Sequence, residues 1–208
     1  MSHIESSWKF AEELVTESDA IAEARQHSLE VGVDAVSPAV GAQLAVLTAA
    51  SSAKSIIEIG TGVGVSGLWL LTGAPEATLT TIDKEIDHQQ LARDAYLRAG
   101  VPVNRVRLIA GRASDVLPRM NENSYDVVFI DADAASVIEY VEHGLRLARP
   151  GGVVLVAHAL WNGRVANPAA RDATTTGYRT LLTEVSTSPA VISSMSTAGD
   201  GLLSLVKR

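Results

Sequence analysis

The chain has 208 residues, 47% of them hydrophobic, so it can bury one substantial core but is too short for two ordinary domains. Its 17 Lys and Arg against 24 Asp and Glu give a net charge of −7, which argues against nucleic acid or an anionic membrane as partner and leaves small molecules. Cysteine is absent, which excludes disulfides, zinc–thiolate sites and thiol nucleophiles.

Residues 1–54 have apolar residues at helical spacing, which predicts three helices before the first strand. The first two apolar faces comprise Trp8, Ala11, Leu14 and Val15, and then Ile21, Ala22, Ala24 and Leu29. Ser18 or Asp19 is a candidate N-cap for the second helix, and Pro38 suits the first turn of the third. We expect a single domain over 1–208, in which 1–54 form a helical lid and 55–208 a cofactor-binding sheet core.

The stretch after residue 54 reads as a strand, a glycine turn and a helix. The apolar run Ile56–Ile59 leads into spaced glycines, which allow a sharp turn and bring a ligand against bare amides at a helix N-terminus. The glycines in Glu58–Gly64 match the first motif of S-adenosylmethionine-dependent methyltransferases, and those in Gly62–Gly67 match the dinucleotide fingerprint. Glu58, a candidate partner for the methionine amino group, favours the methyltransferase, and a tight turn without ligand is the third alternative.

Beyond this turn the pattern alternates between strands and helices, which predicts a parallel sheet. The expected strands are 78–83, 106–110, 127–131 and 152–156, and the expected helices are 87–100, 113–120, 135–148 and 171–185. A turn at 149–151 precedes the last of these strands. Two extended pieces, 190–194 and 201–207, flank the turn 198–200 and form a closing hairpin, which adds an antiparallel strand as in methyltransferases and not as in dehydrogenases.

Several strand ends carry polar residues that suit a nucleotide-like ligand. Asp83 lies about twenty residues beyond the glycines, where its carboxylate can accept hydrogen bonds from both ribose hydroxyls, although such an Asp is also a common cap. The small residues of Gly111–Ser114 offer a turn against which an adenine ring can lie, or simply a helix start. Asp131 and Asp133 follow the fourth strand, where paired acids can bind a cation, orient a substrate or cap a helix.

The one long irregular segment, 161–172, follows the carboxyl end of a predicted strand. Loops at that edge form ligand mouths in open α/β sheets, and a mobile surface loop is an equally open alternative.

Three parts of the sequence together resemble a known family: residues 57–66 around the glycine turn, residues 125–133, and residues 149–154 with the later 160–165. They resemble the small O-methyltransferases of the catechol and caffeoyl-CoA type, and the resemblance runs from about Trp8 to the C-terminus. It implies an α/β fold with a Rossmann-like, seven-stranded methyltransferase sheet, mostly parallel with an antiparallel C-terminal hairpin strand. Helices on both faces, extra N-terminal helices and a homodimer are also implied.

The same resemblance implies S-adenosylmethionine as cofactor and S-adenosylhomocysteine as product. The implied cofactor-binding residues are Val36, Glu58, Gly60, Gly62, Ser66, Asp83, Ala113 and Asp131. In this assignment Glu58, Gly60 and Ser66 hold the methionine end, and the backbone around Val36 holds its carboxylate. Asp83 then lies at the ribose and Ala113 near the adenine.

The departures from the family concern the metal and the catalytic lysine. The family's divalent metal is held by an Asp at the position of Asp131 and by an Asp-Asn pair, which is replaced here by Ala157-His158. The lysine position falls on Ala134. Magnesium prefers octahedral oxygen coordination, so we expect no metal ligands and a metal-independent enzyme. His158 is then the candidate proton acceptor, with Asp131 orienting it or the substrate.

We therefore expect a cytoplasmic, S-adenosylmethionine-dependent O-methyltransferase acting on a phenolic or catechol-like hydroxyl, with Trp161 best placed for an aromatic acceptor. No apolar run approaches the roughly 20 residues that span a bilayer, and residues 1–9 lack a signal-peptide apolar region. One alternative is a protein that binds the cofactor without catalysis. A nicotinamide-dependent oxidoreductase is less expected, because neither Tyr140 nor Tyr178 begins a Tyr-x-x-x-Lys pair.

Overall fold

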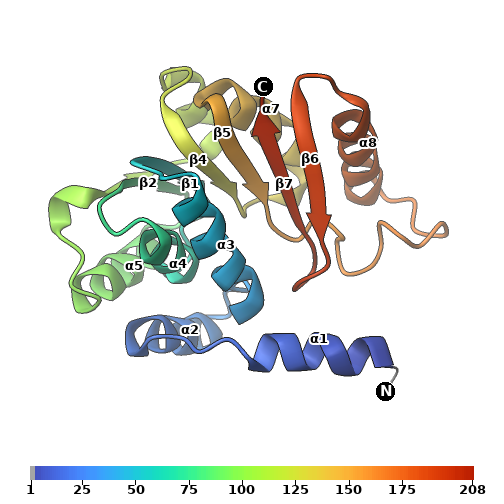
Figure 1. The fold of residues 1–208 in the computed structure, drawn as a ribbon. Helices are drawn as coiled ribbons and strands as arrows, with labels where there is room; N and C mark the ends of the chain where they lie inside the picture. Colours follow the sequence, from blue (N-terminus) through green and yellow to red (C-terminus); the bar gives the residue numbers. More distant parts are fainter. Residues whose placement is uncertain (1–2) are drawn as a thin grey trace.

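The structure is a computed structural model that describes residues 3–208, drawn as a ribbon in Figure 1. Its α-helices are α1 (His3–Glu13), α2 (Asp19–Val31), α3 (Pro38–Ala50), α4 (Val65–Gly73), α5 (Ile86–Arg98), α6 (Ala113–Val116), α7 (Val137–Leu147) and α8 (Ala173–Thr187). Its strands are β1 (Ser55–Ile59), β2 (Thr78–Asp83), β3 (Val106–Ala110), β4 (Tyr125–Ile130), β5 (Ala148–Val156), β6 (Val191–Ser196) and β7 (Leu202–Lys207). Short 3₁₀ helices cover Val103–Arg105, Leu117–Arg119 and Ala134–Ser136.

The strands form one seven-stranded sheet in the order β3-β2-β1-β4-β5-β7-β6. The first five of these are parallel, and β7 runs antiparallel to both β5 and β6. The expected mostly parallel sheet with an antiparallel C-terminal hairpin strand is therefore confirmed. The strand order reverses between β1 and β4, and ligands of open α/β sheets bind at the carboxyl ends of such a strand pair. In Figure 1 the arrowhead of β4 points down.

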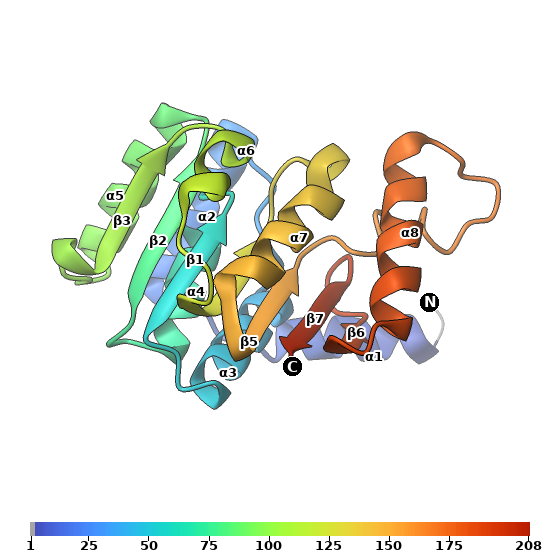
Figure 2. The same ribbon diagram turned by 90° about the horizontal axis from the view of Figure 1, so that it is seen from above.

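Helices cover both faces of the sheet, which Figure 2 shows from above. One apolar core lies between the sheet and α2 to α5 and includes Leu44 and Leu70; the other lies under α6 to α8 and includes Leu117. β1 serves both cores, because Ile56 belongs to the first and Ile57 to the second. This double burial explains why the strand is almost entirely apolar. Among residues 3–208, no helix is long and apolar enough to cross a membrane.

The N-terminal helices form as expected, but the apolar faces expected on the first two are only partly buried. The Ser18 hydroxyl accepts a hydrogen bond from the Ile21 amide, and Pro38 lies in the first turn of α3. We expected Leu29 to share an apolar face with Ile21, which is buried, but Leu29 is 71% exposed. The two residues are eight positions apart, which turns Leu29 by roughly 80° around the helix axis from Ile21. The grouping of Leu29 is therefore corrected.

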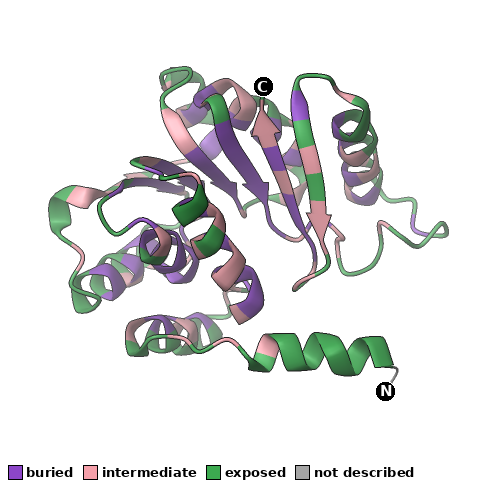
Figure 3. Cartoon of the chain, in the orientation of Figure 1, coloured by how far each residue is buried: buried purple, intermediate pink, exposed green. Residues whose placement is uncertain are grey.

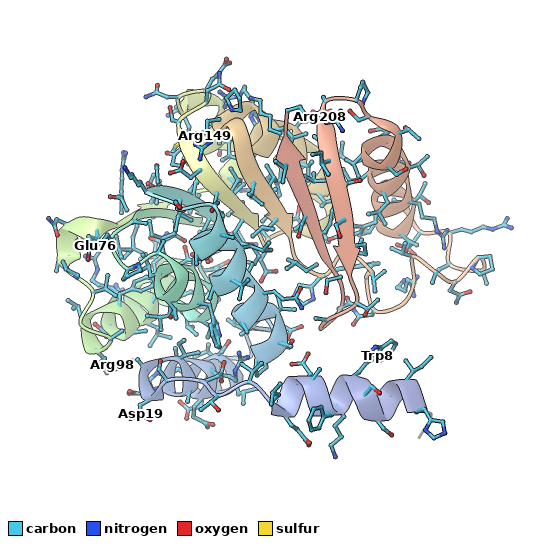
Figure 4. All side chains as sticks on the ribbon, in the orientation of Figure 1. Trp8, Asp19, Glu76, Arg98, Arg149 and Arg208 are labelled. Carbon is cyan, nitrogen blue, oxygen red and sulfur yellow. The ribbon has the colours of Figure 1, made fainter. Side chains whose placement is uncertain are left out.

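The apolar face expected on the first helix is also corrected. α1 ends at Glu13, before Leu14, and it has no buried residue. Figure 3 shows it almost wholly exposed, and Figure 4 shows Trp8 on the side of α1 that faces the sheet. Trp8 is 52% exposed, so the spacing predicted the helix correctly but not the burial of its apolar residues.

Several element boundaries also differ from the expectation, and two of them have a local cause. The turn expected at 149–151 lies within β5, where Gly151 has φ +76° and the pairing with β4 shifts between Tyr125 and Val127. Residues 149–152 of β5 lie opposite the single residue Asp126 of β4, so they loop out of the pairing and the strand then continues. The helix expected from residue 135 begins at Val137, after a 3₁₀ turn.

Candidate active site

A cavity of about 540 Å³ opens at the carboxyl ends of β1, β2 and β4. This volume lies within the usual range for small-molecule sites. Seven residues predicted to bind a cofactor line it: Val36, Gly60, Gly62, Ser66, Asp83, Ala113 and Asp131. Two predicted site residues, Glu58 and His158, do not. The sheet thus brings most of the predicted residues together, although the outermost two, Val36 and Asp131, lie 95 positions apart in the sequence.

The first position of the glycine turn, Gly60, must be glycine for a steric reason. Gly60 has φ +96°, and a Cβ there would lie 1.8 Å from the Asp131 carbonyl oxygen. Asp131 in turn donates its backbone N–H to the Ile59 carbonyl at 2.8 Å. Only glycine allows the ends of β1 and β4 to approach this closely, which places the Asp131 carboxylate at the cavity.

Asp83 fixes the turn from the neighbouring strand. Its Oδ2 accepts hydrogen bonds from the Thr61 amide at 3.0 Å and the Gly62 amide at 2.9 Å, and its Oδ1 accepts one from the Glu85 amide at 3.0 Å. A carboxylate has about four acceptor positions, so one remains for a ligand hydroxyl. The capping role of Asp83 is thus present, and its role toward a ligand stays a prediction.

Glu58 lies behind the cavity wall. It is fully buried, and its two oxygens accept hydrogen bonds from the Ser66 hydroxyl at 2.6 Å and the Thr81 hydroxyl at 2.7 Å. Burial raises the pKa of Glu58 from its usual value near 4.5 to about 8, against the effect of these two hydrogen bonds. The expected direct contact with a methionine amino group does not fit this geometry, because Ser66 lies between Glu58 and the cavity.

Asp131 also faces a second, smaller cavity of about 40 Å³. That space holds a few water-sized groups and is too small for an aromatic ring in this conformation. It is bounded by His158 and by Trp161, whose ring stacks on Tyr178 at 5.6 Å between centroids. Burial raises the pKa of Asp131 to about 6; the charge of His158 opposes this rise and that of Asp34 adds to it.

His158 follows β5 in a left-handed backbone conformation, with φ +54°. Such a conformation is uncommon for a non-glycine residue and is often found at functional sites. The imidazole lies between two carboxylates: Nε2 is 3.6 Å from Asp131 Oδ1, and Nδ1 is 3.8 Å from Asp200 Oδ2. The expected pairing of His158 with Asp131 is thus present in space, and Asp200 is an addition.

Sequence reasoning placed Asp200 in a turn and gave it no role. The signal was available in the topology, because β7 runs antiparallel to β5 and must therefore begin at the carboxyl edge. A turn that precedes such a strand lies beside the active-site loops.

The segment 161–172 is held by the guanidinium of Arg179 on α8. Its nitrogens donate to the carbonyl oxygens of Val165 at 2.9 Å, Ala170 at 2.7 Å and Arg164 at 2.9 Å, and also to that of Asn167. Arg164 donates in turn to Asp172 Oδ2 at 2.5 Å. This organisation favours the binding-loop alternative, and Arg179 was missed because nothing local in the sequence links it to the loop.

Comparison with known proteins identifies the family to which this chain belongs. Residues 11–208 match the family model described as O-methyltransferase. The chain belongs to the O-methyltransferase family. A relative from Mycobacterium avium (strain 104), assigned by name provisionally to the O-methyltransferases, is 44% identical over 207 residues, covering 99% of this chain and 93% of its own. Family membership confirms the resemblance and sets the oxidoreductase alternative aside.

Two solved structures resemble this O-methyltransferase closely. The O-methyltransferase TomG from Streptomyces achromogenes, involved in tomaymycin synthesis and solved with SAM, is 31% identical with a TM-score of 0.85, covering 100% of this chain and 99% of its own. The O-methyltransferase from Bacillus cereus, solved with SAH, is 26% identical with a TM-score of 0.85, covering 98% and 97%.

The donor set of this O-methyltransferase does not fit the divalent metal implied by the resemblance. Ala157, in place of the family's Asp, is buried and carries no donor atom. That leaves one carboxylate and one imidazole at the three positions, whereas magnesium takes oxygen ligands in octahedral geometry. Within residues 3–208, no other group of three Asp, Glu or His side chains is arranged to hold a metal ion.

Proposed function

We propose that this O-methyltransferase transfers a methyl group from S-adenosylmethionine to a hydroxyl oxygen of a small acceptor. The observation that carries this proposal is the junction of the two cavities at Asp131, which lines both. A cofactor in the larger cavity and a hydroxyl in the smaller one would meet at this side chain. The SAM and SAH complexes of the two related structures support the choice of cofactor.

The residues present fit this cofactor. Asp83 offers one free acceptor position to a ribose hydroxyl, and Ser66 and Val36 also line the cavity. Ala113 closes the cavity with a small side chain that leaves room for an adenine ring. When bound, the cofactor supplies a methyl group on a positively charged sulfur. Carboxylates such as Asp34 and Asp131 suit that charge.

The remaining chemistry belongs to the protein. The acceptor hydroxyl must lose a proton as its oxygen bonds to the methyl carbon, and His158 Nε2 points toward Asp131, where that hydroxyl would lie. Trp161, Tyr178 and the loop held by Arg179 exclude water and orient the acceptor. An aromatic acceptor such as a phenol or catechol requires Trp161 or His158 to move, since the smaller cavity does not hold a ring in this conformation.

We further propose that the reaction needs no divalent metal, because the side chains at the family's three ligand positions do not fit one. With catechol as the first acceptor, methyl transfer should persist in excess chelator. Activity that chelator abolishes and magnesium restores contradicts this part of the proposal. Residues other than those at the three family positions would then have to hold the ion.

The proposal as a whole is tested by calorimetry with S-adenosylhomocysteine, followed by transfer of a labelled methyl group to a panel of phenolic and carboxylate acceptors. The rival function, cofactor binding without catalysis, is favoured by the small volume of the acceptor cavity. Tight binding without transfer to any acceptor would support the rival. Absence of binding would overturn both.

We also propose a homodimer, in which a second copy covers α1. Four large apolar side chains of α1 and the residues just after it are at least half exposed: Ile4, Trp8, Phe10 and Leu14. Large apolar side chains left exposed on one helix commonly mark an interface. Light scattering tests this, and a monomer mass near 21.9 kDa would refute it. The cytoplasm is the proposed compartment, and cell fractionation tests it.

A further inference from the structure

The turn between β6 and β7 is held firmly against the loop that carries His158. Leu160 donates its amide to the Asp200 carbonyl at 2.9 Å, and Ala159 donates to the Gly201 carbonyl at 3.1 Å. The Asn162 amide donates to Asp200 Oδ2 at 2.6 Å. Three hydrogen bonds thus fix the Asp200 backbone and carboxylate relative to the residues that flank His158.

Close packing holds the same turn from both sides. A Cβ on Gly201 would lie 2.6 Å from Leu160 Cγ, and a Cβ on Gly199 would lie 2.8 Å from Val40 Cγ2 on α3. Both glycines have positive φ. The turn is therefore wedged between α3 and the loop after β5, so the position of the Asp200 carboxylate is set by the fold and not by a flexible surface turn.

The two carboxylates beside His158 differ in what else they face. Asp131, near Nε2, lines both cavities, whereas Asp200, near Nδ1, lines neither. Only the Nε2 edge of the imidazole is therefore directed to the place where an acceptor hydroxyl would lie. A neutral imidazole carries its proton on one nitrogen and a lone pair on the other, and the partner of one nitrogen decides which is which.

We propose that Asp200 is a positioning residue that holds the proton of His158 on Nδ1 and leaves Nε2 free to accept a proton from the acceptor hydroxyl. This inference rests on the proposed function of the site. From the sequence we expected Asp131 to orient either His158 or the substrate, but a hydrogen bond from Nε2 to Asp131 would occupy the nitrogen that faces the reaction. The present 3.8 Å separation exceeds a hydrogen bond, and catalytic hydrogen bonds often shorten when the substrate complex forms.

The protonated nitrogen can be identified directly by nuclear magnetic resonance. Ligand-free protein labelled with ¹⁵N-histidine is measured in long-range proton–nitrogen correlations under alkaline conditions, and His158→Gln assigns the signal. The expected result is a His158 ring with its proton on Nδ1. A ring with its proton on Nε2 in the unmodified protein overturns the proposal, whatever the variants do.

Asp200→Asn supplies the second measurement. The amide oxygen of Asn can still accept the Asn162 amide, so the turn should keep its fold, but the negative charge beside Nδ1 is gone. We expect at least a several-fold shift of the His158 population toward the Nε2-protonated form, and no shift in the surface control Asp94→Asn. An unchanged population in Asp200→Asn overturns the proposal. S-adenosylhomocysteine calorimetry on the same samples tests the cofactor function separately, because its failure would leave the position of the ring proton measurable.

Discussion

The carboxyl edge of the sheet has two halves that are built differently. The cofactor half, at the ends of β1 and β2, uses backbone amides of a glycine turn, which the neighbouring Asp83 holds in place. The acceptor half, beyond β4 and β5, uses side chains, and three of its non-glycine residues adopt left-handed conformations: His158, Trp161 and Asn162. In the cofactor half the residues with positive φ are glycines, which adopt it without steric strain. In the acceptor half they carry side chains, so the backbone strain is retained.

This difference indicates how the two halves divide the work. A left-handed non-glycine residue costs on the order of 1 kcal/mol, and it persists only where surrounding contacts determine it. At Asn162 one such contact is the hydrogen bond to Asp200 in the hairpin turn, and Arg179 on α8 holds the rest of the loop. The cofactor half is therefore self-contained, whereas the acceptor half depends on the C-terminal third of the chain. Variants that affect one half and spare the other test this division.

The largest effect is expected from His158→Ala, which should lower kcat by about 10² or more while leaving the binding of S-adenosylhomocysteine unchanged. The imidazole lies beside Asp131 at the junction of the cavities, and His158 does not line the larger cavity formed by the glycine turn. Labelled methyl transfer and calorimetry measure the two quantities. His3→Ala, at an exposed position of α1, is the matched control. A fully active His158→Ala would assign proton removal to solvent or to another residue.

Next in size is a pH effect that resides in the cofactor half. The pKa of Glu58 is raised to about 8 in the folded protein, so between about pH 5 and pH 8 the folded state holds a proton that the unfolded chain releases. Stability should therefore fall as pH rises through this range, relative to Glu58→Gln. One pKa unit corresponds to about 1.4 kcal/mol, so the difference should amount to a few kcal/mol.

Urea unfolding of Glu58→Gln and the unmodified protein at several pH values measures this difference. Other titrating groups are common to both proteins and cancel. The exposed Glu184→Gln should run parallel to the unmodified protein. Parallel curves for Glu58→Gln would show that Glu58 titrates in the folded protein much as it does in the unfolded chain.

These two variants also mark what the sequence could predict. The glycine turn, the position of Asp83 at the end of a strand and the alternation of strands and helices follow from residues near one another in the chain. The structure confirms all three. Asp200 and Arg179 could not be assigned in this way, because their partners depend on the antiparallel hairpin and on the packing of α8. The carboxylate within the apolar first strand was one case in which the expected position differs from the observed one. Glu58 was expected at the ligand, yet its two hydroxyl partners hold it one layer behind.

Asp83→Ala should weaken S-adenosylmethionine binding by about 1.5 to 3 kcal/mol, the range for charge-assisted hydrogen bonds. It also removes the acceptor of the Thr61 and Gly62 amides, so part of the loss should appear as a less stable turn. Calorimetry measures the binding and urea unfolding measures the turn. An unchanged dissociation constant would leave Asp83 with the turn role alone and weaken the assignment of the cofactor half.

The smallest effect is expected from Arg179→Lys, and it should be confined to the acceptor half. The guanidinium reaches four carbonyl oxygens from three nitrogens, whereas an ammonium offers three donors at one point and cannot span them. Because water can rehydrate exposed loop carbonyls, we expect a loss of about 1 to 2 kcal/mol in stability.

That loss should have a clear location. Protease cleavage within 161–172 should become faster and methyl transfer slower in Arg179→Lys, while the affinity for S-adenosylhomocysteine stays the same, because Arg179 contacts no residue of the glycine turn. Arg171→Lys, at an exposed position of the same loop, controls for the change of side chain. If Arg179→Lys weakens S-adenosylhomocysteine binding as much as it slows transfer, Arg179 stabilises both halves of the site. The acceptor half would then not be independent of the cofactor half. If cleavage is unchanged, the loop is held by Trp161 stacking on Tyr178, and the guanidinium is secondary.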